Sequence, residues 1–114
     1  MIGPFSLGAD VIRRLITRKT AGYYMLSRSK TPSGTWAFDY CGRSDADLAS
    51  RLESHVGNYS VFWYAEAANA REAYQAECRL WHKYSPRDNQ VHPAAPANTG
   101  YKCPVPGCPF SRAA

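Results

Sequence analysis

The sequence predicts one small domain of the mixed α+β class, followed by an irregular tail. Three segments have the alternation or aromatic content of strands, and three have the apolar spacing of amphipathic helices. The 114 residues are 45% hydrophobic and 13% aromatic, which suffices for a modest core and argues against a disordered chain.

The first half of the chain predicts a helix and a hairpin. Apolar residues at helical spacing indicate a helix over about residues 7–19. Residues 21–27 are aromatic and apolar enough for a strand, and residues 35–41 alternate in the manner of a second. The turn-forming residues 29–34 lie between them, so the two strands form a hairpin with a long loop.

The second half predicts helix, strand and helix. Ser44 is suited to cap a helix over about 45–56, and residues 59–65 read as a third strand. Asn69 begins a capping-box pattern that opens a helix ending near Tyr84.

These elements give a domain over residues 1–86 and a proline-rich tail over 87–114 that packs on it. The formal net charge of +5 favours a polyanionic partner. There is no apolar run of membrane-spanning length, so no membrane partner is expected. Residues 1–6 lack the pattern of a secretion signal, which predicts a cytoplasmic protein with reduced or metal-bound thiols.

The helix over 45–56 carries a group of candidate catalytic residues. At about 100° per residue, Arg51 and His55 lie on one line at the rim of its buried face. Arg43 lies at its start, and Tyr24 and Tyr40 come from the hairpin. Either Arg51 or His55 alone is most simply a surface residue. Together these phenols, guanidiniums and imidazole suit attack on a phosphodiester.

Glu77 falls in the middle of the apolar face of the last helix. A buried carboxylate needs a cationic partner. One interpretation is a structural ion pair with Arg51. The other is a divalent cation that acts as a Lewis acid on a phosphate.

Taken in order, these residues resemble the motifs of the GIY-YIG nuclease superfamily over about residues 21–84. The matching motifs are Gly22-Tyr23-Tyr24, Tyr40-Cys41-Gly42, Arg51, His55 and Glu77. The resemblance implies a small three-stranded antiparallel sheet flanked by helices. It also implies metal-dependent hydrolysis of DNA or, less often, RNA.

The resemblance also implies roles for single residues. Tyr24 or His55 orients or deprotonates the attacking water, Arg51 stabilises the pentacoordinate phosphate, Arg43 is a second basic group, and Tyr40 helps to order the site.

By the same resemblance, Glu77 holds a single Mg²⁺ or Mn²⁺. Family members often carry an asparagine after the glutamate helix, for which Asn89 and Asn98 are candidates. No separate DNA-recognition domain is evident, so specificity must come from the tail, a dimer or a partner protein.

A second metal site is predicted from the cysteines. Cys78 and His82 lie one turn apart on the last helix, and the tail adds a C-x₄-C loop. The predicted structural zinc ligands are Cys78, His82, Cys103 and Cys108. His92 is a competing ligand and Cys41 a remote one. Alternatively, Cys78 is a buried apolar residue and the tail thiols are free or disulfide-bonded.

The function predicted first is a metal-dependent endonuclease with a structural zinc site in its tail. The alternative is a non-catalytic, zinc-containing nucleic-acid-binding module that keeps the nuclease-like fold. A third hypothesis is a protein-interaction domain in which Trp36, Trp63 and Trp81 belong to the core.

Overall fold

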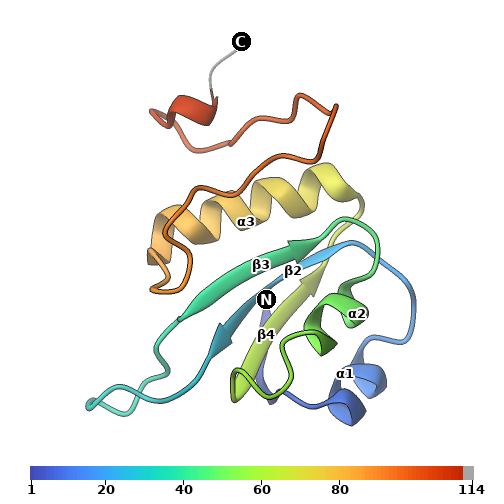
Figure 1. Ribbon diagram of the computed structural model, residues 1–114, viewed down its shortest axis with the longest axis vertical. Helices are drawn as coiled ribbons and strands as arrows, with labels where there is room; N and C mark the ends of the chain where they lie inside the picture. Colours follow the sequence, from blue (N-terminus) through green and yellow to red (C-terminus); the bar gives the residue numbers. More distant parts are fainter. Residues whose placement is uncertain (112–114) are drawn as a thin grey trace.

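A computed structural model describes residues 1–111 and contains a four-stranded antiparallel sheet with helices on both faces (Figure 1). The strands in sheet order are β1 (Ile2–Ser6), β4 (Val61–Glu66), β2 (Gly22–Ser27) and β3 (Tyr40–Ser44). The helices are α1 (Ala9–Leu15), α2 (Leu48–Glu53), α3 (Ala70–Tyr84) and η1 (Pro109–Ser111). The predicted α+β class is confirmed.

The predicted number of three strands is wrong, because β1 adds a fourth at the edge beside β4. Most of its residues are exposed, so β1 lacks the apolar pattern that marks a strand in sequence. Phe5 anchors it to the sheet, with its ring centroid 5.7 Å from that of Phe62 and 6.1 Å from that of Tyr64.

The hairpin forms, but its second strand was predicted too early in the chain. β3 begins at Tyr40 and continues through Ser44, which pairs with Gly22. Before it, Trp36 makes only an isolated bridge to Lys30, and Phe38 packs against the ring of Trp63. The alternation over 35–41 therefore reflects aromatic contacts of the loop as well as strand pairing.

The two short helices occupy fewer residues than the sequence predicts. Because Ser44 belongs to β3, α2 starts later and Asp47 caps it by accepting a hydrogen bond from Ser50 N. Arg43 consequently lies in β3 rather than at a helix terminus, and His55 lies just after α2. The bounds of α3 agree with the prediction, and Asn69 caps it.

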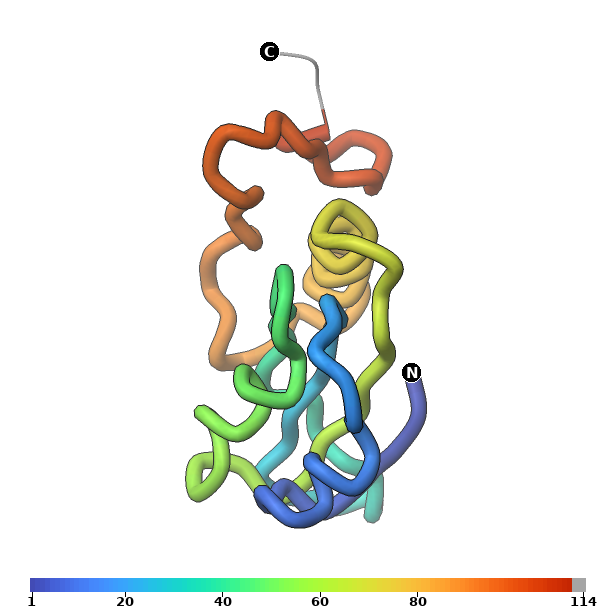
Figure 2. Tube along the Cα trace, turned by 90° about the vertical axis from the view of Figure 1, so that its right-hand side faces the viewer, coloured from blue at the N-terminus to red at the C-terminus, as the bar shows by residue number. Residues whose placement is uncertain are grey.

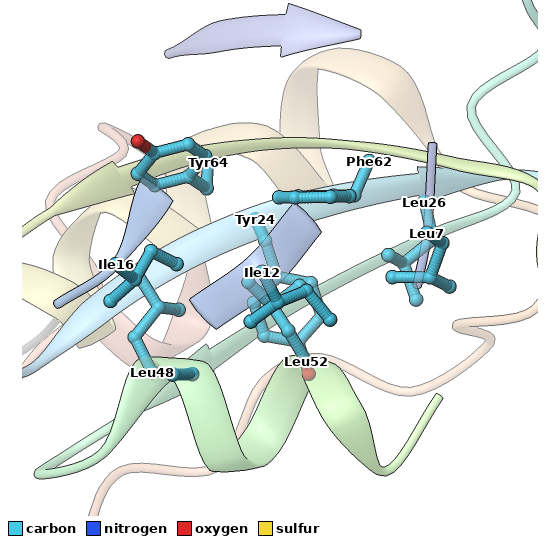
Figure 3. Packing of buried hydrophobic residues seen from close by; sticks show 10 residues of the cluster. Leu7, Ile12, Ile16, Tyr24, Leu26, Leu48, Leu52, Phe62 and Tyr64 are labelled. Carbon is cyan, nitrogen blue, oxygen red and sulfur yellow. The ribbon is translucent and has the colours of Figure 1, made fainter. Parts of the chain in front are cut away.

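The main core lies between the sheet and the helices α1 and α2 (Figure 3). Alternate residues of a strand face opposite sides of the sheet. Tyr24 and Leu26 of β2 therefore join this core, while Tyr23 packs with Ala73 of α3 on the opposite face.

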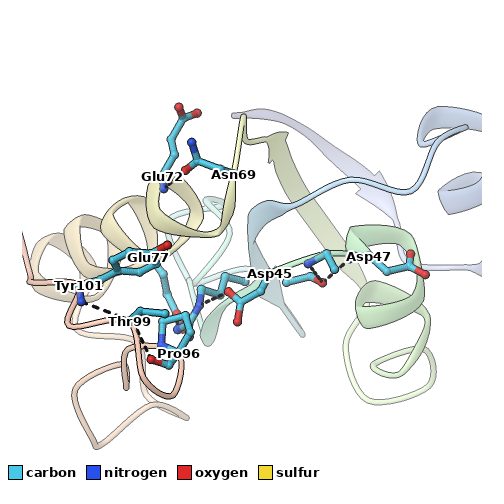
Figure 4. Close-up of polar contacts among 11 residues, drawn as sticks. Asp45, Asp47, Asn69, Glu72, Glu77, Pro96, Thr99 and Tyr101 are labelled. Atoms are coloured by element: carbon cyan, nitrogen blue, oxygen red, sulfur yellow. Dashed lines mark hydrogen bonds and ion pairs between the residues drawn. The ribbon is translucent and has the colours of Figure 1, made fainter.

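The tail runs along α3 on the side turned away from α1 and α2 (Figures 1 and 2). A small cluster joins Tyr74 and Cys78 of α3 to Cys103 and Cys108 of the tail. The tail also makes a local turn, in which the Thr99 hydroxyl donates to Pro96 O at 2.7 Å (Figure 4). Among residues 1–111, no helix has the length and apolar character needed to cross a membrane.

Candidate functional site

A polar cavity opens at the outer edge of β3. Its lining residues are Tyr24, Tyr40, Gly42, Arg43, Asp45, Arg51 and Glu77. β3 is an edge strand, so side chains from both faces of the sheet can meet at its open side. Tyr40 and Gly42 share a face with Tyr24, whereas Arg43 turns toward α3 and reaches Glu77.

Tyr24 is joined to His55 behind the cavity. The phenol oxygen lies 2.9 Å from His55 Nε2. Tyr24 is 1% exposed, and burial raises the pKa of its phenol. Burial, followed by the nearby charge of Arg51, lowers the pKa of His55. At neutral pH the phenol therefore keeps its proton and the imidazole is neutral, so the phenol can donate to Nε2.

Arg43 bridges two carboxylates. Its Nη1 lies 2.7 Å from Glu77 Oε1, and its Nε lies 2.8 Å from Asp45 Oδ1 (Figure 4). The guanidinium also lies over the ring of Tyr74, 5.1 Å from the centroid. Burial raises the pKa of Glu77, and the hydrogen bond from Arg43 acts in the opposite direction. The cation that the buried Glu77 requires is thus Arg43, and not Arg51 as one interpretation of the sequence held.

Arg51 projects from α2 into the cavity and is largely exposed. It forms no ion pair within residues 1–111. Its guanidinium is therefore available to an anion that enters the cavity, unlike that of Arg43.

Gly42 allows the phenol of Tyr24 to lie against β3. A Cβ at Gly42 would be 2.5 Å from both Cζ and the hydroxyl oxygen of Tyr24. Gly22 is restricted in the same way, because its Cβ would lie 2.6 Å from the carbonyl oxygen of Ala65. Both glycines are therefore required by close packing of β2 and β3 rather than by a turn.

The structure thus brings together all six predicted catalytic residues, five of them in the cavity wall and His55 behind Tyr24. Sequence reasoning missed Asp45, whose place in the first turn of a predicted helix indicated only a dipole interaction. Its place two positions after Arg43 is the signal that could have found it, because an extended chain puts side chains two positions apart on one face.

Asn89 has a backbone role at the same edge. Its Oδ1 accepts from Cys41 N at 2.8 Å, and its Nδ2 donates to Cys41 O at 2.9 Å. Trp81 Nε1 donates to Asn89 O at 3.0 Å, which ties the residue to α3. Asn89 therefore covers the outward-facing peptide groups of the edge strand beside Tyr40. The other candidate, Asn98, has a positive φ of 63° in a tail turn.

A second group of side chains lies where the tail meets α3. One potential ligand atom each from His82, His92, Cys103 and Cys108 falls within 4.8 Å of the others. Two imidazoles and two thiols are a donor set that binds zinc. Cys78 lies outside this group, so the predicted ligand set differs at one position, and His92 stands in its place. Cys78 instead packs with Tyr74 in the small cluster under the tail.

Comparison of the chain with protein-family models, curated proteins and solved structures found no match.

Proposed function

We propose that the protein is a metal-dependent endonuclease that hydrolyses phosphodiester bonds in DNA or RNA, with a mechanism of the GIY-YIG type. The observation that carries this proposal is the cavity at the edge of β3. It combines the hydrogen-bonded Tyr24–His55 pair, the guanidinium of Arg51, which forms no ion pair within residues 1–111, and the carboxylate of Glu77. The net charge of +5 supports a polyanionic substrate.

The Tyr24–His55 pair supplies the proton acceptor. Water attacks phosphorus and transfers its proton to the Tyr24 oxygen, while the Tyr24 proton moves to His55 Nε2. The new P–O bond forms as the bond to the leaving oxygen breaks, and the leaving oxygen takes a proton from solvent. Because burial raises the pKa of Tyr24, the phenol does not ionise beforehand, and its proton must leave as the water proton arrives.

The cationic side chains stabilise the charge that develops on the phosphate. Arg51 contacts the non-bridging oxygens, because it is the cavity guanidinium without a carboxylate partner among the described residues. Arg43 fixes the position of Glu77 and neutralises part of its charge. The ring of Tyr40 packs 5.1 Å from that of His55, centroid to centroid, and limits its movement.

The donor groups also fit a magnesium or manganese ion. Each carboxylate has two oxygens, so Glu77 and Asp45 retain acceptor capacity beyond their bonds to Arg43. One or two carboxylates, with water in the remaining positions, is the usual protein contribution to Mg²⁺ binding. When bound there, the ion supplies Lewis-acid stabilisation of the phosphate.

The test is cleavage of supercoiled plasmid and labelled single strands by pure protein with Mg²⁺ or Mn²⁺. Glu77→Gln keeps the shape of the side chain and removes its charge, so cleavage should fall by about 10²-fold or more while nucleic-acid affinity changes little. Glu72→Gln is the matched control, because Glu72 lies on α3 outside the cavity.

Arg51→Ala should also abolish most cleavage, and Arg79→Ala, an exposed arginine on α3, should not. Equal cleavage by Glu77→Gln, Arg51→Ala and the wild type would contradict the assignment of the site.

A non-catalytic nucleic-acid-binding module is the second candidate, favoured by the Arg43–Glu77 ion pair, which already satisfies the buried carboxylate. It predicts no cleavage with any divalent metal. It also predicts an affinity that falls with salt and with removal of arginines.

A further inference from the structure

We propose that His82, His92, Cys103 and Cys108 bind Zn²⁺ in a closed structural site that fastens the tail to α3. This zinc site is independent of the proposed nuclease activity. Its four ligands come from the last turn of α3, the segment after it, and the two ends of the C-x₄-C loop.

The imidazole of His82 supports a metal ion at this position. His82 Nε2 is buried and has no hydrogen-bond partner among residues 1–111. An unpaired buried polar atom is unfavourable. A potential ligand nitrogen of the His82 imidazole lies within 4.8 Å of ligand atoms of Cys103, Cys108 and His92. A metal ion bound among them satisfies the nitrogen without moving the helix.

The orientation of His92 is already that of a metal ligand. Its Nδ1 lies 2.8 Å from Pro93 O, and a carbonyl oxygen can only accept, so Nδ1 carries the proton. Nε2 is then the unprotonated nitrogen, and it lies 3.4 Å from Cys108 Sγ. A backbone carbonyl that holds one imidazole nitrogen while the other binds metal is the usual outer partner of zinc histidines. The His92 ring is stacked on the Phe110 ring, with 4.3 Å between the centroids, so Phe110 covers one face of the imidazole.

The two thiols of the tail loop supply the sulfur donors of the proposed site. Cys103 and Cys108 are both free and are 2% and 5% exposed. Their loop is held by backbone hydrogen bonds from Cys103 N to Phe110 O at 3.0 Å and from Cys108 N to Val105 O at 3.3 Å. Sulfur and nitrogen donors select zinc over magnesium, and four protein ligands leave no open position for catalysis.

The tail needs such a fastening. Between residue 87 and residue 111 it forms one 3₁₀ turn and no strand, and its buried cysteines pack in the small cluster on α3. Segments with so little core are commonly held by metal or disulfides.

The first test is zinc content and Co²⁺ absorption of the purified full chain. The expected result is one Zn²⁺ per chain and, after exchange, a thiolate-to-cobalt charge-transfer band. His92→Ala should weaken zinc binding by more than the roughly 10–100-fold that loss of an outer hydrogen-bond partner causes. Cys78→Ala is the matched control and should keep full zinc content, since Cys78 lies outside the ligand group.

Three results would overturn the proposal. The first is a chain without zinc or a cobalt–thiolate band. The second is a mass lower by two hydrogens, with the disulfide assigned to Cys103 and Cys108 by peptide mapping. The third is loss of zinc in Cys78→Ala with retention in His92→Ala.

The second test does not depend on any variant being folded. Wild-type protein is treated with a chelator, its zinc loss is verified, and it is then digested briefly with trypsin. Cleavage after Lys102, next to the ligand Cys103, should appear only after zinc removal, while the domain over residues 1–86 stays intact. A tail that remains protected after verified zinc loss would contradict the proposed fastening. Neither test uses nuclease activity, so the zinc site and the nuclease proposal can fail separately.

Discussion

Gly42→Ala tests how closely the site depends on packing at the edge of β3. The added Cβ would be 2.5 Å from Cζ and from the hydroxyl oxygen of Tyr24, and 2.9 Å from Cε2. Ordinary carbon contacts begin near 3.5 Å, so the ring must withdraw by about 1 Å. Tyr24 is buried, and its hydroxyl lies 2.9 Å from His55 Nε2, so this movement displaces the phenol from its present position beside the imidazole.

Two effects of known size should follow. Overpacking a buried site costs about 1–3 kcal/mol of unfolding free energy, which urea denaturation measures. A displacement of about 1 Å in a catalytic group can reduce the rate about a hundredfold, which single-turnover plasmid cleavage under Mg²⁺ measures. The substrate affinity should change little, because Arg51 is not displaced.

Gly8→Ala is the control, since a Cβ at Gly8 has no atom within 4 Å. Gly8→Ala should cleave at the wild-type rate and lose only about 1 kcal/mol of unfolding free energy, because alanine is a poorer N-cap of α1 than glycine. Unchanged stability of Gly42→Ala would refute the close contact with Tyr24. The expected stability loss with undiminished cleavage would instead refute the role of Tyr24 in proton transfer.

Four further predictions concern the same edge of the sheet. Tyr24→Phe should lower cleavage about 10²–10⁴-fold, whereas Tyr59→Phe, which also loses one phenolic hydrogen bond, should retain the wild-type rate. Burial and a nearby guanidinium lower the pKa of His55, so cleavage should persist as pH falls to 6.5 and decline only below it. His55→Gln should abolish this dependence of the rate on pH. Protonation of His55 should also lower the free energy of unfolding as pH falls below 6.5, because the imidazole binds a proton more readily in the unfolded chain than in the folded one. Urea denaturation midpoints measured against pH test this direction. Asn89→Ala should cost about 1–3 kcal/mol in urea denaturation, because two peptide groups of β3 lose their partner, while Gln90→Ala should have little effect.

The extent of sequence-based prediction differs between elements for physical reasons. Both ends of α3 could be predicted, because its apolar stripe is long and its cap, Asn69, accepts a hydrogen bond from Glu72 N, three residues further along the chain. β1 could not, since an exposed edge strand owes its pairing to β4 and has little pattern of its own. α2 was predicted too long because the extension of β3 through Ser44 depends on pairing with Gly22, a contact across the hairpin.

The same division holds for the two candidate sites. The sequence was sufficient to place Glu77 in an apolar helix face and to infer a cationic partner. The choice of Arg43 over Arg51 depends on the pleat of β3, which turns Arg43 toward α3. Cys78 and His82 share one shoulder of α3, so helix geometry alone could not tell that His82 joins the candidate metal group while Cys78 lies outside it and packs beside Tyr74 and the tail cysteines.

The sequence by itself determined the properties that depend on neighbours along the chain: the α+β class, the bounds of α3, the hairpin, and the residue types suited to phosphodiester and zinc chemistry. Only the tertiary structure decided how these groups combine. It set Gly42 beneath the phenol of Tyr24, Asn89 on the backbone of Cys41, and His92 among the tail thiols. Such contacts join residues far apart in the chain, and packing at the edge of β3 and along α3 selects among partners that are chemically equivalent in the sequence.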